Sequence, residues 1–472
     1  MKRVLQAILM CLFAGAAVGA DRPNVLLVSI DDLNDWTGCL GGHPQPKTPN
    51  IDRLAKRGTL FTNAHCQSPV CNPSRASLLT GRHPHTSGVY FLGPDLKQAP
   101  ALRDLDTLPE RFAKHGYRTL AAGKLFHTGD KRFFQEYGGA MGGFGPRPKK
   151  KISQPHGHPL WDWGAYPDND QDMPDYRIAS WAVGKLKALP KDAENPFFMG
   201  VGFFRPHVPM YAPQKWFDLF PRDQIELPLV RDNDRDDLSD YAIALTNEKH
   251  VSPKHSWVNS AGQWEHAVQA YLASTAFADH CLGLVLDALD ASPHRDNTIV
   301  VLFADHGFHL GEKQRWAKRT IWEDGTRVPL IVAAPGFQLG QRTSRPAQLL
   351  DIFPTLLELT GLPADDTQEG HSLVRLLKDP QAKWPHVALS SFGKGNYAVR
   401  SEQFRYIRYL DGSEELYDHH NDPHEWDNLA GNHELVEVIQ AHRQHLPAQE
   451  ADVLPGNSTG HQAYKAASRL LD

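Results

Sequence analysis

The residues with the clearest chemical potential lie in the string Cys71-Asn72-Pro73-Ser74-Arg75-Ala76-Ser77-Leu78-Leu79-Thr80-Gly81-Arg82. Proline is favoured at the first position of a helix, so Pro73 predicts a helix that begins just after Asn72. Cys71 would then lie at a helix N-terminus, where unpaired backbone N–H groups and the positive end of the helix dipole favour an anion. A lone cysteine is more often a packing residue. The position is also one where a nucleophile and an oxyanion could meet, and at this point the residues leave both roles open.

Two further pairs of polar residues follow apolar segments. Asp31-Asp32 follows the β-branched run Asn24–Ile30, and Asp305-His306 follows Thr298–Ala304. Paired carboxylates can cap the next turn or bind a metal ion, and Asp31-Asp32 by itself does not separate these two roles. The second pair favours a metal, because two strand ends can then supply four ligands. Mostly carboxylate oxygens with one imidazole suit a hard cation such as calcium.

Basic residues and histidines occur in three other segments. Lys124 and His127 belong to Gly123-Lys124-Leu125-Phe126-His127-Thr128-Gly129, which follows an apolar run at 118–122. His207 lies between two prolines, and Lys318 ends the basic stretch 312–318. Taken singly, such residues are usually exposed loop residues or solvated charges. Their relevance to catalysis depends on whether the fold brings them close to the carboxylates at the strand ends.

The apolar segments predict how these residues are positioned. Buried strands are expected at 24–30, 118–122, 197–203, 298–304 and 330–334. Helices are expected between them at 51–57, 108–115, 177–189 and 264–289. Alternating strands and helices predict an open α/β sheet that binds ligands beyond the carboxyl ends of its strands. Several of the polar residues above follow these strands directly.

The pattern changes near Trp384. Shorter strands at 397–400, 405–409 and 415–417, with a turn at Asp411-Gly412, predict a small α+β domain. We therefore expect a signal peptide at 1–20, a catalytic domain at 21–384 and a C-terminal subdomain at 385–472. Segments 142–159, 168–175 and 231–240 are expected to be long surface excursions.

The N-terminus predicts export. Lys2 and Arg3 precede an apolar run at 4–18, and Val18-Gly19-Ala20 suits signal-peptidase cleavage. The run is shorter than the ~20 apolar residues that span a bilayer, and no later segment is expected to be long and apolar enough, so stable membrane insertion is not expected. Cys11 leaves with the leader, and Cys39, Cys66, Cys71 and Cys281 remain without a disulfide framework.

The charge balance argues against one class of partner. Removal of Lys2 and Arg3 takes two positive charges from a formal net charge of -5 and leaves -7. A protein of this charge has no electrostatic support for nonspecific nucleic-acid binding. Nucleic acid is therefore not an expected partner.

The string 71–82 resembles the sulfatase signature Cys-x-Pro-Ser-Arg-x-x-x-Leu-Thr-Gly-Arg at every specified position. Segment 123–127 is similar to the Gly-Lys-x-x-His motif of the same family, and the resemblance extends over nearly the whole mature chain. The chain is thus identified by resemblance as a formylglycine-dependent type I sulfatase. Many members carry asparagine where this chain has His306, and histidine there is similar to the iduronate-2-sulfatase branch.

The resemblance implies an alkaline-phosphatase-like fold, with a large mixed, mostly parallel sheet flanked by helices and a smaller antiparallel C-terminal sheet. It implies that a formylglycine-generating enzyme oxidises Cys71, whose aldehyde hydrate attacks sulfur. Arg75 would steady the hydrate, Lys124 and Lys318 would hold the sulfate, and His207 would serve the leaving oxygen. His127 would act on the formylglycine hydroxyl.

The same resemblance implies one calcium ion per chain and no further cofactor. The implied metal ligands are Asp31, Asp32, Cys71, Asp305 and His306. The function expected from this set is hydrolysis of sulfate monoesters on a sulfated carbohydrate, in the periplasm or outside the cell.

Two alternatives remain open at this stage. A phosphonate or phosphodiester hydrolase of the same superfamily would use the same aldehyde and a similar cluster of cations. A noncatalytic binder of sulfated glycans would use the basic loop that contains Arg147, Lys149, Lys150 and Lys151. The sequence does not name the sugar, the ring position or the oligomeric state.

Overall fold

The computed structural model describes residues 22–190, 195–246 and 251–471. The predicted signal peptide, with Cys11, lies outside the described residues. Within them, Cys39, Cys66, Cys71 and Cys281 are all unpaired.

An eight-stranded sheet forms the centre of the protein, in the order β13-β2-β12-β9-β1-β7-β4-β5. Its central strand, β1 (Asn24–Ile30), pairs in parallel with both β7 (Phe197–Phe203) and β9 (Thr298–Ala304). Every residue of these three strands is buried. Their continuous apolar sequences fit strands that are covered on both faces.

The outer strands make the sheet mixed. They are β2 (Thr59–Phe61), β4 (Arg118–Gly123), β5 (Glu136–Tyr137), β12 (Leu330–Ala333) and β13 (Gln341–Thr343). β12 runs antiparallel to β9 and β2, whereas β4 runs parallel to β7 and β5. The predicted fold class, a large mostly parallel sheet flanked by helices, is confirmed.

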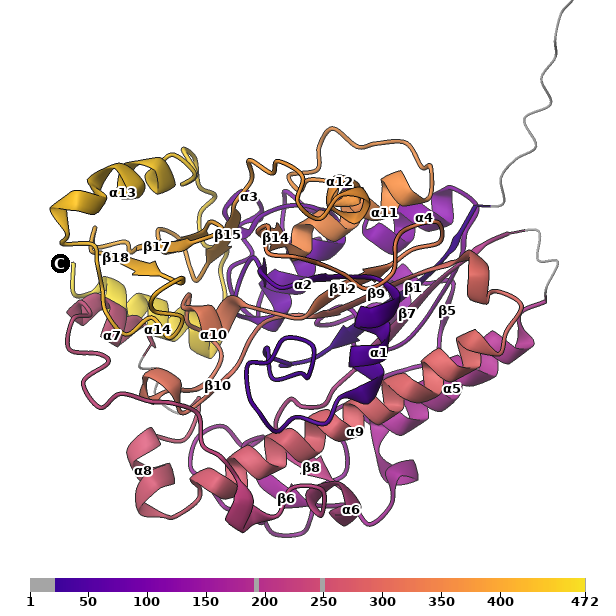
Figure 1. The fold of residues 1–472 in the computed structure, drawn as a ribbon, viewed down its shortest axis with the longest axis horizontal. Helices are drawn as coiled ribbons and strands as arrows, with labels where there is room; N and C mark the ends of the chain where they lie inside the picture. Colours follow the sequence, from indigo (N-terminus) through magenta and orange to yellow (C-terminus); the bar gives the residue numbers. More distant parts are fainter. Residues whose placement is uncertain (1–21, 191–194, 247–250, 472) are drawn as a thin grey trace, which may run out of the picture.

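Helices cover both faces of this sheet (Figure 1). One layer contains α1 (Pro49–Arg57), α5 (Pro174–Ala188) and α9 (Trp264–Asp290). The other contains α2 (Cys71–Thr80), α4 (Leu108–Lys114), α11 (Ile352–Leu359) and α12 (Val374–Lys378). The four helices predicted between the strands are present as α1, α4, α5 and α9, with ends shifted by at most three residues.

Helix α9 corrects one expectation. By length and composition alone it could cross a membrane, although the sequence analysis expected no such segment after the leader. In the structure 83% of its most apolar window is buried inside the protein. Its apolar character is therefore that of a core helix, packed against α5 and α1.

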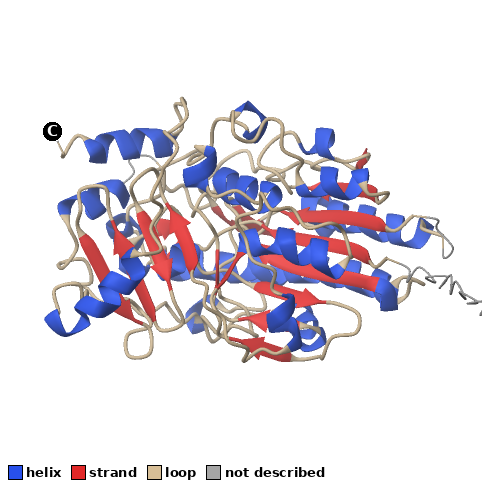
Figure 2. Ribbon diagram, turned by 90° about the horizontal axis from the view of Figure 1, so that it is seen from above, coloured by secondary structure: helices blue, strands red, loops and turns tan. Residues whose placement is uncertain are grey.

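The C-terminal part forms a separate antiparallel sheet, seen as a second group of strands in Figure 2. Its strands are β15 (Ala388–Ser391), β16 (Tyr397–Arg400), β17 (Phe404–Arg408) and β18 (Glu414–Asp418). Helices α13 (Val436–Arg443) and α14 (Thr459–Ser468) accompany it. Helix α7 (Asp240–Thr246), which precedes α9 in the chain, packs on α14.

The remaining elements are short. Two-stranded sheets are formed by β3 (Ala64–His65) with β14 (Ala347–Gln348), β6 (Trp163–Ala165) with β8 (Met210–Ala212), and β10 (His309–Leu310) with β11 (Trp316–Ala317). Short helices are α3 (Pro84–Ser87), α6 (Gln214–Phe217), α8 (His255–Ser260) and α10 (Glu323–Thr326). The predicted excursion at 142–159 contains neither helix nor strand.

Candidate active site

The carboxyl ends of β1 and β9 bring the two predicted acidic pairs together. Asp31 and Asp32 follow β1, while Asp305 and His306 follow β9, and all four are at most 1% exposed. Asp32 has a φ of 64°, a left-handed conformation that is uncommon for a residue other than glycine. The Asp32 N–H donates to Asp305 Oδ1 at 3.1 Å, which ties the two strand ends to each other.

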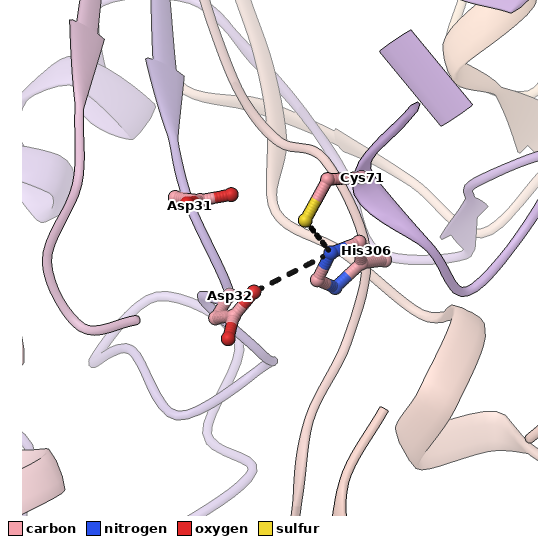
Figure 3. Close-up of side chains that lie close together, drawn as sticks. All are labelled: Asp31, Asp32, Cys71 and His306. Atoms are coloured by element: carbon pink, nitrogen blue, oxygen red, sulfur yellow. Dashed lines mark hydrogen bonds and ion pairs between the residues drawn. The ribbon is translucent and has the colours of Figure 1, made fainter. Parts of the chain in front are cut away.

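Cys71 lies against this pair of strand ends. Figure 3 shows its sulfur pointing at His306, whose Nε2 is 3.2 Å from Sγ. Helix α2 begins at Cys71, so Pro73 is its third residue and the predicted start after Asn72 is wrong by two positions. The first i→i−4 bond of the helix runs from the Ser74 N–H to the Val70 carbonyl. Cys71, the predicted nucleophile, therefore lies in the open first turn of the helix.

Arg75, one turn further along α2, fixes the carboxylates. Its NH2 donates to Asp31 Oδ1 at 3.1 Å, and its Nε donates to Asp305 Oδ2 at 2.9 Å. Its NH1 donates to the Lys124 carbonyl at 2.6 Å. Arg75 is 1% exposed, so these hydrogen bonds replace those that its guanidinium group would make to water. It joins the ends of β1, β4 and β9 through one guanidinium group.

Two lysines reach the same cluster from different elements. Lys124, which follows β4, donates from Nζ to Asp31 Oδ2 at 2.6 Å. Lys318, which follows β11, donates to Asp32 Oδ1 at 2.5 Å and to Cys71 Sγ at 3.3 Å. The structure thus places both predicted sulfate-binding lysines beside the predicted metal ligands.

The two predicted catalytic histidines differ in their placement. His207 is 8% exposed, and its Nε2 lies 3.8 Å from Asp32 Oδ2. Its Nδ1 is 2.6 Å from the Val208 carbonyl, which leaves Nε2 as the nitrogen that faces the cluster. His127 is half-buried, and no hydrogen bond links it to Cys71 among the residues that the structure describes. Its Nδ1 is buried without a hydrogen-bond partner there.

The charges in the cluster are only partly matched. Burial would raise the pKa of the Cys71 thiol, but Lys124 and Lys318 bring this pKa well below its usual range. Burial also opposes ionisation of Asp31, and Lys124 and other cations nevertheless hold the pKa of Asp31 well below its ordinary value. For Asp32, burial prevails over Lys318 and raises the pKa to about 7. One carboxyl of the pair therefore lacks sufficient positive charge.

The donor set fits a hard cation. Ligand atoms of Asp31, Asp32, Cys71 and His306 all lie within 4.8 Å of one another. Asp32 Oδ2 is buried and has no hydrogen-bond partner among the described residues. Asp305 is outside this group of four, and its oxygens accept from Arg75 and the Asp32 N–H. A calcium ion would supply the positive charge that Asp32 lacks.

One neighbour of the site was missed by the sequence analysis. The Phe144 ring lies 4.6 Å from the His207 ring and 5.5 Å from Lys124 Nζ. It therefore packs against two predicted catalytic side chains. Phe144 lies in a segment rich in glycine and proline without apolar periodicity, so the sequence offers no signal that places it.

Comparison with known proteins agrees with this geometry. A family model described as "Sulfatase" matches residues 23–362, and one described as "N-sulphoglucosamine sulphohydrolase, C-terminal" matches residues 311–452. A protein from Formosa agariphila named "Sulfatase" is 41% identical over 91% of this chain and 87% of its own length. Iduronate 2-sulfatase of Mus musculus is 30% identical over 73% of this chain and 69% of its own.

Among solved structures, the phosphonate monoester hydrolase of Agrobacterium radiobacter superposes with a TM-score of 0.74 over 90% of this chain and 94% of that one. At 22% identity this likeness shows the fold alone. The family match and the two sequence relatives go further: the chain belongs to the sulfatase family. It is accordingly an enzyme of the sulfuric ester hydrolase class.

Proposed function

We propose that this sulfatase releases sulfate from a sulfated carbohydrate, with a formylglycine made from Cys71 as nucleophile and one bound calcium ion. The observation that carries the proposal is the position of Cys71 Sγ, 3.2 Å from His306 and 3.3 Å from Lys318 at the start of α2. The sulfur stands in for the formylglycine oxygens. A buried nucleophile at this position has beside it the positively charged side chains of Lys124 and Lys318, which a sulfate monoester needs for binding.

The chain's own residues have separable tasks in this proposal. Formylglycine would supply a geminal diol, and calcium, held by Asp31, Asp32, Asp305 and His306, would supply positive charge for the sulfate oxygens. Lys124 and Lys318 would bind the same oxygens from two sides and neutralise their charge.

The two histidines would handle protons. His207 would bind the leaving alcohol oxygen through Nε2, since its Nδ1 is engaged by the Val208 carbonyl. Burial, together with Lys318, keeps the pKa of His207 well below its usual range without substrate, so the charge of the incoming sulfate would favour its protonation. His127 would take the hydroxyl proton when sulfate is expelled.

A carbohydrate substrate is supported by relatives and by charge. The name of the mouse relative, iduronate 2-sulfatase, refers to a sulfated uronic acid. In this chain, burial and the neighbouring Arg319, Arg147 and Lys151 lower the pKa of His158. Basic side chains therefore gather around His158, close to Arg319, which is the neighbour of Lys318 in the sequence. A polyanionic sugar would meet favourable charge there. We extend the proposal to an iduronate-2-sulfatase-like substrate, a sugar that carries both sulfate and carboxylate.

The proposal also includes maturation and location. A formylglycine-generating enzyme would act on Cys71, and the leader at 1–20 would export the chain to the periplasm or beyond. Mass spectrometry of the peptide that spans Cys71, from protein made in its native host, would show a loss of about 18 Da, the thiol-to-aldehyde change that makes the nucleophile. An active protein with an intact thiol would overturn the proposed nucleophile.

Substrate tests separate the alternatives. We expect calcium-dependent sulfate release from an aryl sulfate, and S–O cleavage, so that label from ¹⁸O-water enters sulfate and not the alcohol. Faster cleavage of an aryl phosphodiester would favour a phosphoester hydrolase. Retention of sulfated polysaccharide without any sulfate release, even with the aldehyde present, would favour a glycan binder. Sulfated oligosaccharides with defined uronate sulfation would then test the sugar.

A further inference from the structure

A second group of side chains that could hold a metal ion lies outside the cluster around Cys71. His309 opens β10, Glu312 begins the short 3-10 helix η6 (Glu312–Gln314), and Asp324 is the second residue of α10. One ligand atom from each lies within 4.8 Å of the others. His309 lies in β10, Glu312 in the turn between β10 and β11, and Asp324 in α10, which follows the hairpin. None of the three is used in the proposed sulfatase chemistry.

His309 gives the group its strongest indication of a ligand. The side chain is 0% exposed, and its Nε2 lies 2.6 Å from Thr320 Oγ1. Its Nδ1 has no hydrogen-bond partner among the described residues, and lies 3.7 Å from Asp324 Oδ2. An imidazole with one nitrogen fixed by a hydrogen bond and the other turned bare towards carboxylates has the arrangement of a metal ligand.

Among the described residues, no lysine or arginine forms an ion pair with Glu312 or Asp324, whose only such contact is that of Asp324 with His309. Burial, with Asp35 adding to it, raises the pKa of Glu312 to about 7. Burial and the neighbouring Glu312 also raise the pKa of Asp324 well above its ordinary value. Burial, Arg315 and Lys313 lower the pKa of His309. Lys313 itself donates to Asp234 at 2.9 Å, and Arg327 donates to Asp35 at 3.0 Å. The acids therefore face each other and a bare imidazole nitrogen.

A third acidic group provides a contrast within the same structure. Glu323, His419 and Glu425 also lie close enough to hold an ion. Their charge, however, is already matched, because Arg405 pairs with both glutamates. Proximity of acids and a histidine is therefore not enough, and the group at His309 differs because no arginine pairs with its carboxylates among the described residues.

We propose that His309, Glu312 and Asp324 bind a divalent transition cation of the zinc type. One imidazole nitrogen and two carboxylates are a ligand set that zinc accepts, and the share of nitrogen is higher than in the cluster around Cys71, where three aspartates and one histidine suit a hard cation. Asp324 is 38% exposed at its side chain, so an ion can enter from solvent and retain a water ligand. The inference does not depend on the proposed sugar substrate or on formylglycine.

The position of the group gives the ion a structural role. His309 pairs with Ala317, the residue before Lys318, in the β10–β11 hairpin. Four non-glycine residues in this segment have left-handed φ values: Lys313 at 49°, Gln314 at 56°, Ala317 at 80° and Arg319 at 76°. Such conformations persist only when their surroundings hold them. An ion that joins β10 to α10 would brace the segment that presents Lys318.

The test uses the full chain and zinc as the probe. Protein stripped with a chelator and returned to saturating calcium is incubated with Zn²⁺, dialysed and analysed for metal content and thermal unfolding. We compare the wild type with His309→Gln, Glu312→Gln and Asp324→Asn. Asp296→Asn, whose side chain is 98% exposed, is the matched control. Asp31→Asn reports zinc held by the catalytic cluster instead.

We expect one zinc per chain and a zinc-dependent rise in Tm in the wild type, Asp296→Asn and Asp31→Asn. Loss of a ligand should weaken zinc binding at least ~10-fold and remove the Tm rise in the other three variants. Glu312→Gln and Asp324→Asn alter partly exposed side chains, so they test the site even if His309→Gln fails to fold. Zinc that persists in both, zinc that is lost only in Asp31→Asn, or no bound zinc in the wild type would overturn the proposal.

Discussion

Two buried clusters of charged side chains in this protein differ in how completely their charges are matched. Around Glu323 and Glu425 the match is complete: Arg400 and Arg405 pair with Glu323, and Arg405 and His419 pair with Glu425. These partners outweigh burial and hold the pKa of Glu323 well below its ordinary value. We call this the closed cluster.

The catalytic cluster around Cys71 is open by comparison. Asp32 keeps a buried oxygen without a hydrogen-bond partner among the described residues, and burial raises its pKa to about 7. Both clusters contain acids, cations and a histidine, so composition does not distinguish them. The difference teaches that unmatched charge, rather than buried charge, marks the place where a ligand belongs.

The largest effect should come from removing the nucleophile of the open cluster. Cys71→Ala should lower sulfate release at least ~10³-fold, because no other group can form the covalent intermediate. The measurement is sulfate release from an aryl sulfate with aldehyde-containing protein. Cys66→Ala is the control, since Cys66 is equally buried five residues away and should retain activity. Comparable turnover by the Cys71 variant would contradict the assignment of the nucleophile.

Breaking the closed cluster should instead affect stability. Glu425→Gln removes one of the two carboxylates that Arg405 and His419 share, leaving Glu323, and should lower the free energy of unfolding by about 3 kcal/mol. Urea denaturation measures this. The matched control is Glu402→Gln, which removes a surface pair with Arg345 and should cost less than about 1 kcal/mol. Equal losses in the two variants would mean that the ion pairs of the closed cluster contribute no more to stability than a surface pair.

Bound calcium should supply the positive charge that the open cluster lacks. At calcium concentrations about 100-fold above the Kd, the wild type should gain about 2.7 kcal/mol in unfolding free energy, and a chelator should reverse the gain. Asp32→Asn should lose most of this gain, because it removes a charged ligand. Without calcium the same variant should be no less stable than the wild type, since the buried Asp32 carboxylate has too little positive charge beside it. A full calcium response in Asp32→Asn would show that the ion binds elsewhere.

The smallest effect concerns a single buried acid near the closed cluster. Burial raises the pKa of Glu415 from 4.5 to about 7. A raised carboxyl pKa contributes stability that is present below pH 4.5 and is lost as the pH rises through 7. The wild type should therefore lose about 2.5 kcal/mol more than Glu415→Gln between pH 5 and 8. Unfolding free energies that change by the same amount with pH in the two proteins would contradict this prediction.

Much of the fold was accessible from sequence because its central strands are uniformly apolar. The bounds predicted for β1, β7 and β9 agree with the structure to the residue. The short strands β2 and β13 were missed, because three residues carry too little pattern to separate them from a loop. The start of α2 was misplaced since a proline is tolerated anywhere in a first turn, where its missing N–H has no helical partner.

The site was predictable where it follows from strand ends and less so where it depends on long-range packing. Asp31, Asp32, Asp305 and His306 lie where buried parallel strands must end together. The approach of Lys318 to Cys71 joins residues 247 positions apart, and periodicity contains no information about it. Phe144 and the group at His309 likewise depend on contacts between distant loops, which local patterns do not encode.

The burial of Cys71 also has a consequence for the order of events during synthesis. Cys71 is 2% exposed in the folded protein, yet His306, which covers it, is 235 residues further along the chain. At a synthesis rate of about 5 to 20 residues per second, the ribosome needs roughly 10 to 50 s to reach that residue. A modifying enzyme would therefore meet Cys71 in an extended, accessible chain for that time. Once the sheet closes, the opportunity ends, so the yield of active enzyme would be set by a race between oxidation and folding.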